Sequence, residues 1–395
     1  MNAFKISNQI VYIIIIFVIM CAGWSRVTYG KNQSSGIINV LLKESCSSVN
    51  IRCSGWIEIT SDSEESLKLP CSEFGLPISI KPSSSGISIN DFEIDLRTIH
   101  LNNVAENNPL QIDDYAYRGE IIILVDSQWK LKVINSLDLN SYLCGIMKSE
   151  ISPDWPDEVL KAQAIIARTY ALREISLQKY DAYDLKASID SQVYIGMTGE
   201  DPRTNRAVHE TEHYILTLNG EIFPAFYHAC CGGHTESAQN IFGDYPSVIG
   251  IACDYCSNSP HFEWEYIITP IELRNILLRN DYRADPIKTI EIVNRYPAGR
   301  VNQLSIKYNP SQSSSSRLLI KGKKLRELLG YDTLRSSNFT VNFKNGHFIF
   351  HGKGWGHGVG LCQWGAKSMG EIGARYEEIL NKYYPYAEIT RIEAY

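Results

Sequence analysis

After its first thirty residues, the chain alternates apolar and polar positions in short runs that Ser, Pro and Gly separate. Clear cases are residues 37–42, 56–59 and 78–80. An alternation with a period of two is typical of antiparallel strands that bury one face. Two later runs predict a hairpin that turns at residues 126–128. We therefore expect a β-rich N-terminal domain over residues 31–135.

The strongest helix signal in the chain begins at Pro156. Proline suits a first helical turn, Asp154 can act as a cap, and the acidic residues that follow complement the positive end of a helix. The segment up to about Gln178 is apolar around most of its circumference, which predicts a buried helix. Lys161 and Arg168 lie on one face of it. Two readings of this pair stay open: side chains that reach out to solvent, and a cationic stripe directed at a site.

The later segments mix both patterns. Residues 322–329 predict a short basic helix, and residues 339–350 predict a pair of strands that turns at Asn345-Gly346. A Gly-rich segment at residues 351–366 leads into a C-terminal helix. Together with the β-rich start, these elements predict an α+β fold. We place its mixed second domain at residues 136–395.

The N-terminus carries an export signal. Lys5 precedes an apolar run from Val11 to Trp24. A run of roughly 14 apolar residues matches a signal peptide better than a bilayer-spanning helix, which needs about 20. We expect residues 1–30 to be a signal peptide or a retained membrane anchor. The rest of the chain would then work outside the cytoplasm, where thiols can be oxidised.

The composition narrows the class of protein. The 395 residues are 44% hydrophobic and 21% charged, with a net charge of -6. Such a chain can bury a full core in two or three domains, which argues against disorder. There is no basic surplus to displace counterions from phosphates, so we expect no nucleic-acid partner.

Four of the ten cysteines lie near histidines in the second domain, and two of them form a Cys-x-x-Cys motif. Soft ligands with this spacing are typical of a tetrahedral zinc site. In an exported protein the same cysteines could form disulfides, so both readings stay open. A nucleophilic cysteine beside a histidine is a third reading, without an orienting signature. The candidate metal ligands are Cys230, Cys231, Cys253, Cys256, His228 and His234.

The Gly-rich segment combines glycines with aromatic and amide side chains. It has no Walker lysine and does not lie in a βαβ unit, so we expect neither a nucleotide nor another organic cofactor. Trp355, His357, Gln363 and Trp364 offer stacking faces and hydrogen-bonding groups. That mixture suits an uncharged polar polymer such as a sugar chain. The same pattern also fits a tight structural crossing of the backbone.

Glu150 is the candidate acid. It lies between a strand-like segment and the Pro-initiated helix. Partial burial there would raise the pKa of its carboxyl, which could then donate a proton near neutral pH. Spacing alone makes this a weak signal, because a lone glutamate is usually a surface residue.

Four blocks of the chain resemble the SpoIID/LytB family of peptidoglycan-acting proteins, from about residue 119 onward. The most specific is Gly354-Trp355-Gly356-His357-Gly358-Val359-Gly360, followed by Gln363-Trp364-Gly365-Ala366. The other three blocks are residues 139–170, which contain Glu150, then Gln192-Val193-Tyr194-Ile195-Gly196, and then residues 224–238.

The resemblance implies an action on glycan strands. SpoIID-type members are lytic transglycosylases that cleave strands, preferably peptide-stripped ones, to 1,6-anhydro-muramic ends, and Glu150 matches their catalytic glutamate. LytB-type members are described as amidase enhancers. The alternative is therefore a non-catalytic glycan-binding protein whose partner is a cell-wall amidase. The substrate-binding residues that the resemblance implies are Lys161, Arg168, Gln192, Tyr194, His357 and Gln363.

Two features depart from the family pattern. Some members have a zinc-binding His-Cys pair where this chain has Asp190 and Ser191. We therefore expect no zinc site of that type, and any metal would be structural and held by the cysteine set named above. Cys362 stands where the family often has serine, and we interpret it as a packing residue.

Overall fold

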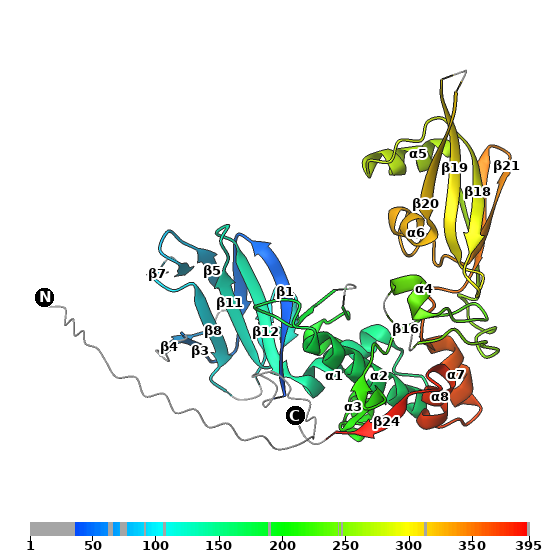
Figure 1. The fold of residues 1–395 in the computed structure, drawn as a ribbon. Coiled ribbons are helices and arrows are strands. Elements are labelled where there is room, and N and C mark those ends of the chain that lie inside the picture. The colour runs from blue at the N-terminus through cyan, green and yellow to red at the C-terminus, as the bar shows by residue number, and fades with distance from the viewer. Residues whose placement is uncertain are drawn as a thin grey trace, which may run out of the picture.

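The computed structural model describes residues 36–61, 66–71, 77–90, 92–105, 108–188, 191–243, 245, 248–311 and 314–392. The predicted export segment at residues 1–30 lies outside these ranges. Among the described residues, no helix combines the length and apolar character that a membrane crossing requires. In the described chain a run of strands, β1 to β12, comes before the first helix, and helices and strands are mixed after it, which confirms the α+β class (Figure 1).

The N-terminal part forms two sheets that share one core. In strand β11 the side chains of Ile121, Ile123 and Val125 are buried while their neighbours are partly exposed, as the alternating pattern predicts. The seven-stranded sheet has the order β13-β1-β12-β11-β8-β3-β4 and the other sheet the order β10-β9-β2-β5-β6-β7. Their bounds are β1 Ile37–Cys46, β2 Val49–Arg52, β3 Trp56–Thr60, β4 Ser66–Pro70, β5 Ile78–Pro82, β6 Ile87–Ile89, β7 Phe92–Ile94, β8 Thr98–Asn103, β9 Leu110–Ile112, β10 Tyr115–Tyr117, β11 Glu120–Val125, β12 Leu131–Asp138 and β13 Leu185–Lys186.

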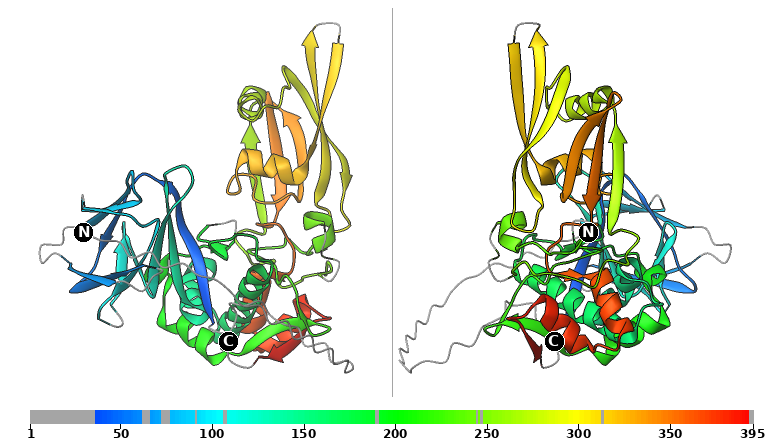
Figure 2. Two further views of the ribbon diagram at one scale, coloured as in Figure 1. Left: turned by 60° about the vertical axis from the view of Figure 1, so that its left-hand side comes forward. Right: turned by 90° about the vertical axis from the view of Figure 1, so that its right-hand side faces the viewer.

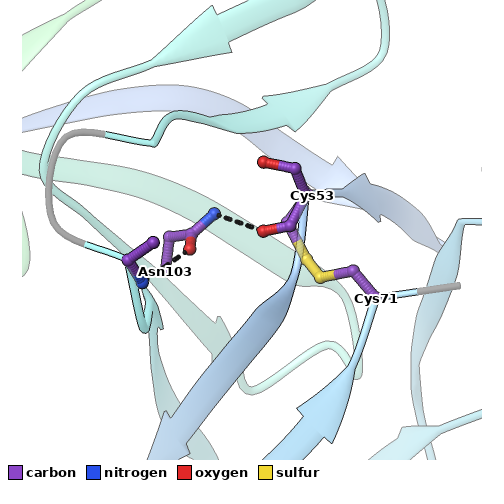
Figure 3. Close-up of a disulfide and its surroundings, with 5 residues drawn as sticks. Cys53, Cys71 and Asn103 are labelled. Atoms are coloured by element: carbon purple, nitrogen blue, oxygen red, sulfur yellow. Dashed lines mark hydrogen bonds between the residues drawn. A yellow bond between two sulfur atoms is a disulfide. The ribbon is translucent and has the colours of Figure 1, made fainter. Parts of the chain in front are cut away.

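A disulfide links Cys53 to Cys71 in this domain (Figure 3). The two Cα atoms are 5.6 Å apart. Beside it, the Asn103 side chain donates a hydrogen bond of 3.3 Å to the carbonyl of Ser54. The bridge therefore joins the segments that flank strands β3 and β4 at the edge of the larger sheet.

Helices α1 and α2 follow the last long strand directly. Helix α1 (Leu139–Glu150) occupies the segment before Glu150 that was predicted to be strand-like, so that prediction is wrong. Asp138 caps it by accepting a hydrogen bond from the Ser141 amide, and its apolar face is buried. Helix α2 (Asp157–Ser176) confirms the predicted buried helix, although its N-cap is Pro156 and Asp154 makes no cap.

The remaining elements of this region complete a shared core with the N-terminal sheets. Strand β24 pairs with β14, and the short parallel pair β16-β23 joins the middle of the chain to the end of the Gly-rich segment. The helix predicted after that segment is present as α7. The bounds are η1 Gly196–Gly199, α3 Pro202–Glu210, β14 Tyr214–Leu218, β15 Glu221–Ile222, β16 Tyr227–His228, α4 Ala238–Phe242, β23 Leu361–Cys362, α7 Gln363–Glu371, α8 Tyr376–Tyr383 and β24 Glu388–Arg391.

A separate arm stands off from these helices (Figures 1 and 2). It has its own hydrophobic core, which includes Leu273, Leu304 and Phe350. The predicted basic helix and the predicted strand pair are both confirmed within it. The bounds are β17 Glu263–Ile268, α5 Pro270–Arg279, β18 Ile287–Arg295, β19 Val301–Ser311, β20 Ser314–Lys321, α6 Gly322–Leu329, β21 Phe339–Lys344 and β22 His347–Lys353.

Candidate functional site

A cavity of about 350 Å³ lies where the end of α1 meets the Gly-rich segment. The residues around it come from six separate parts of the chain, which the parallel pair β16-β23 and the packing of α2 bring together. Most of its wall is aromatic or amide in character. The lining residues are Glu150, Tyr170, Ser191, Gln192, Val193, Phe226, Tyr227, Phe242 and His357.

Glu150 is the last residue of α1 and is half-buried in the cavity wall. Its Oε1 accepts a hydrogen bond of 3.2 Å from the Val193 amide, and the Tyr227 hydroxyl also bonds to the carboxyl. Burial raises the pKa of Glu150, and these two hydrogen bonds lower it by less, so the net shift is upward. The carboxyl is thus poised to hold its proton at a higher pH than an exposed glutamate.

A chain of hydroxyl and amide groups supports this carboxyl from behind. The Tyr142 hydroxyl donates to Gln192 Oε1 over 3.1 Å. Gln192 Nε2 in turn donates to the Tyr227 hydroxyl over 3.3 Å. Gln192 is 1% exposed. Because each buried polar group has a partner, the network fixes the direction in which the Tyr227 hydroxyl faces Glu150.

Gln363 contacts Glu150 from the opposite direction. It is the first residue of α7, and its Nε2 donates to the Glu150 backbone carbonyl over 2.9 Å and to Gln163 Oε1 over 3.3 Å. Its side chain therefore caps an end carbonyl of α1. Gln363 does not line the cavity, so the structure gives it a positioning contact in place of the predicted substrate contact.

His357 lines the cavity as a neutral ring. Its Nδ1 accepts from the Val359 amide over 3.1 Å, so Nε2 carries the hydrogen and donates to the Tyr227 carbonyl over 2.9 Å. Burial, together with the nearby positive charge of Arg300, lowers the pKa of His357 to about 3. A ring with both nitrogens occupied and no charge is a poor proton donor or acceptor for chemistry near neutral pH.

The two basic residues of α2 that were predicted to bind substrate lie away from the cavity. Lys161 is held in ion pairs with Glu158 (3.1 Å) and Glu210 (3.0 Å). Arg168 is fully buried, and its guanidinium donates to the carbonyls of Thr211 (2.6 Å) and Val208 (3.0 Å). Arg168 thus ties α2 to the end of α3. Neither side chain lies near Glu150, contrary to the hypothesis of a cationic stripe directed at the site.

Tyr194 is also placed in the core. It is 4% exposed, its hydroxyl donates to Asn135 over 2.7 Å, and its ring packs against Tyr117 and Tyr142. A methyl group on Gly145 of α1 would lie 2.4 Å from the Tyr194 ring, so glycine is needed for this contact. Tyr194 therefore packs α1 against the N-terminal sheet, outside the cavity.

The predicted metal ligands are only partly brought together. Cys231, Cys253 and Cys256 are buried, and their sulfur atoms lie within 4.8 Å of one another and of Cys362. Cys362, interpreted from the sequence as a packing residue, is therefore the fourth member of what we call the four-cysteine cluster. Such a cluster could bind a metal.

Three predicted ligands lie outside this cluster among the described residues. Cys230 is buried beside it and interacts with Cys256 and Cys362. The His228 Nδ1 is paired with the Val359 carbonyl over 3.1 Å, and the exposed His234 bonds to the carbonyl of its own neighbour, Thr235. The sequence window placed these residues close together, but the turn at the glycine pair directs His234 outward.

Asp190 and Ser191 stand where some family members have a zinc-binding His-Cys pair. Asp190 lies outside the described residues. Ser191 lines the cavity, and its hydroxyl accepts a hydrogen bond of 3.3 Å from the Lys186 amide.

Sequence reasoning missed the aromatic wall of the cavity. Tyr170, Phe226, Tyr227 and Phe242 all line it, and the Phe226 and Phe242 rings stack at a centroid distance of 4.5 Å. Phe226 and Tyr227 lie within one of the quoted family blocks, which is the signal that could have found them. Phe242 lies outside the blocks, and no pattern in the sequence distinguishes it.

The arrangement supports chemistry by a single acid. Among the lining residues of the described chain, Glu150 is the one carboxylic acid. Glycosidases that use water generally need a second carboxyl group, about 5–10 Å away, as base or nucleophile. The cavity instead offers one carboxyl of raised pKa, a neutral imidazole, an amide and flat aromatic faces.

Comparisons with known proteins agree with the sequence blocks. Residues 127–218 match a family model described as stage II sporulation protein, and residues 247–360, which contain the arm, match one described as a domain of unknown function (DUF8618). An uncharacterized protein of Brachyspira hyodysenteriae is 35% identical over 259 residues, which are 65% of this chain and 68% of that protein.

Two Bacillus subtilis proteins are more distant relatives. The amidase enhancer is 26% identical over 63% of this chain and 40% of its own length, so the chain spans less than half of that protein. Stage II sporulation protein D is 23% identical over 66% of this chain and 77% of its own length. The cavity around Glu150 and the family blocks that form it lead to the same assignment: the chain belongs to the SpoIID/LytB family.

Proposed function

We propose that the protein is a lytic transglycosylase that cleaves the glycan strands of peptidoglycan, with Glu150 as general acid and base. The observation that supports this most directly is the single half-buried carboxyl of raised pKa in the cavity wall. A lytic transglycosylase needs no second carboxyl because a hydroxyl group of its own substrate is the nucleophile.

In this reaction Glu150 acts first as the acid and then as the base. The protonated Glu150 gives its proton to the glycosidic oxygen, and the bond between that oxygen and the anomeric carbon of N-acetylmuramic acid breaks. The resulting carboxylate removes the proton from the C6 hydroxyl of the same sugar, whose oxygen bonds to the anomeric carbon. The product is a 1,6-anhydro end, no water is consumed, and Glu150 is protonated again. Steps of this kind contribute about 10²–10⁴-fold each.

The lining residues fit a sugar polymer. Phe226, Phe242 and Tyr170 give the cavity an aromatic surface against which the apolar sides of sugar rings can pack. Gln192 and His357, which also line the cavity, would contact the glycan strand. Lys161, Arg168, Tyr194 and Gln363 would act through the fold, by holding the elements that carry the lining residues.

The setting of the protein follows from the same proposal. Its glycan substrate, and an amidase as a further partner, would be met in the cell wall, outside the membrane. The amidase enhancer among its relatives supports that partner. The disulfide Cys53–Cys71 and the predicted export segment agree with an oxidising compartment.

The second candidate function is a glycan-binding enhancer of an amidase without its own catalysis. The relative named amidase enhancer favours it. This function would need the aromatic wall but not the proton of Glu150.

The test uses peptide-free glycan strands, with mass spectrometry of the products. Wild type should release 1,6-anhydro ends, and Glu150→Gln should lose at least about a hundredfold in rate. Glu210→Gln is the matched control because Glu210 is also the last residue of its helix and lies outside the cavity. Equal cleavage by wild type and Glu150→Gln would remove Glu150 from the mechanism. If no protein cleaves but wild type stimulates an amidase, the enhancer function is correct.

A further inference from the structure

The four-cysteine cluster is a preformed group of buried thiols that the proposed reaction does not use. Cys231 follows strand β16, Cys253 and Cys256 lie in the loop that leads to the arm, and Cys362 precedes helix α7. Each of the four side chains is at most 2% exposed. Three separate segments of the chain thus bring their cysteine sulfurs together at one position that is shielded from solvent.

The sulfur positions match one ion better than two disulfides. With a Zn–S distance of about 2.3 Å, a tetrahedral site separates its sulfurs by about 3.8 Å. All four sulfurs here lie within 4.8 Å of one another, and Cys231 and Cys256 are 3.4 Å apart. A disulfide needs about 2.05 Å within each pair and makes no demand on closeness between pairs.

The surroundings are those of bound thiolates. The Cys231 amide donates to the Cys362 sulfur over 3.2 Å, and the buried Tyr383 hydroxyl lies 3.3 Å from the Cys253 sulfur. Four thiolates around Zn²⁺ carry a net charge of -2, which needs compensation in a dry interior. Arg300 supplies it: the guanidinium is fully buried and donates to the Cys231 carbonyl over 3.2 Å.

We propose that Cys231, Cys253, Cys256 and Cys362 hold one structural Zn²⁺. Cys230, His228 and His234 are not ligands. Closed tetrathiolate sites leave no position for substrate, so the ion stabilises the fold and does not enter the reaction. Metal affinity of this kind adds directly to the folding free energy.

The ion also positions the catalytic wall, an inference that rests on the proposed function. Cys362 is the N-cap of α7, and the next residue, Gln363, donates to the Glu150 carbonyl over 2.9 Å. Cys362 also pairs with His228 in the β16-β23 ladder, one residue from Tyr227. A ligand bond at Cys362 would therefore help to fix Gln363 and Tyr227, whose side chains both contact Glu150.

The test measures zinc and thiols in the full chain, purified without chelator. Wild type should carry about one zinc per chain, and Cys253→Ser should carry almost none. Cys144→Ser is the matched control, because Cys144 is also buried and free but lies in α1. Cys230→Ala should keep its zinc, and a loss of zinc in this variant would overturn the ligand set.

Thiol counts separate the ion from disulfides. In denaturant without reductant, all four cluster thiols should react once the zinc is released. Oxidised cysteines and no zinc would overturn the proposal. If Cys253→Ser does not fold, Co²⁺ exchanged into wild type must give the absorption of a tetrahedral tetrathiolate site, and a spectrum without it overturns the proposal. These readouts hold even if no protein cleaves glycan. If wild type cleaves, removal of the zinc should slow cleavage.

Discussion

The ionisable side chains of the cavity and those of the buried structure next to it have different roles. The cavity exposes one ionisable acid, Glu150, among aromatic and amide groups. Behind it lies what we call the buried scaffold, which consists of Arg168, Arg300 and the four-cysteine cluster, all shielded from solvent. In the scaffold Arg168 and Arg300 bond to backbone carbonyls, whereas Glu150 performs the proposed chemistry. Substitutions in the scaffold should therefore change stability first, and substitutions at the cavity should change the reaction or its pH dependence.

Arg168→Ala should have the largest effect on stability. Its guanidinium bonds to several buried carbonyls, and removal leaves these acceptors unpaired beside an empty space. We expect a loss of about 3–5 kcal/mol in the free energy of unfolding, measured with urea. Lys161→Ala on the same helix is the control. Its half-exposed ion pairs should cost at most about 1 kcal/mol. Equal losses in the two variants would contradict the difference between scaffold and surface.

Gly358→Ala should come next, because it tests Arg300. Gly358 and Gly346 both have φ of +79°, so alanine is strained equally at either position. A methyl group on Gly358 would lie 1.9 Å from the Arg300 guanidinium, whereas Gly346 has open space around it. We expect Gly358→Ala to lose about 1–3 kcal/mol more than Gly346→Ala in thermal or urea unfolding. Similar losses would mean that Arg300 can move aside and is not a fixed part of the scaffold.

The sequence predicted elements more successfully than contacts. Periodicity located several strands of the N-terminal domain, the start signals at Pro156 located helix α2, and the Asn345-Gly346 pair located a turn, because these patterns are local. Helix α1 was missed because it follows strand β12 directly, with no Gly or Pro between them to mark the end of the strand. The family blocks pointed to Glu150, which lines the cavity, and also to Lys161 and Arg168, which do not line it.

Contacts between distant segments account for the rest of the difference. Arg168 is a buried tether because the end of α3, some forty residues later, supplies its acceptors. Cys362 joins the four-cysteine cluster because β23 pairs with β16, about 130 residues earlier in the chain. No pattern within either segment reveals such pairings, which depend on tertiary packing.

The pH dependence of stability tests the raised pKa of Glu150. Between the ordinary value of 4.5 and the higher value in the fold, the folded state binds more protons than the unfolded state. Stability contributed by this carboxyl is therefore lost as the pH rises through that window. Glu150→Gln keeps an acceptor for the Val193 amide but cannot ionise. It should be more stable than wild type above the window and about equal below it, in urea unfolding at pH 4 and pH 8. If the free energies of unfolding of the two proteins differ by the same amount at pH 4 and at pH 8, the raised pKa is contradicted.

Gln363→Ala should have the smallest effect, and it tests the contact at which the scaffold meets the cavity. The substitution removes the hydrogen bond to the Glu150 carbonyl without touching the carboxyl or the lining residues. A hydrogen bond of this kind contributes about 0.5–1.5 kcal/mol, so kcat for glycan cleavage should fall by about tenfold or less. KM should stay unchanged because Gln363 does not line the cavity. Lys367→Ala on the same helix is the control, since Lys367 pairs with Glu371. A rise in KM with unchanged kcat would instead make Gln363 a substrate-binding residue, as the family resemblance implied.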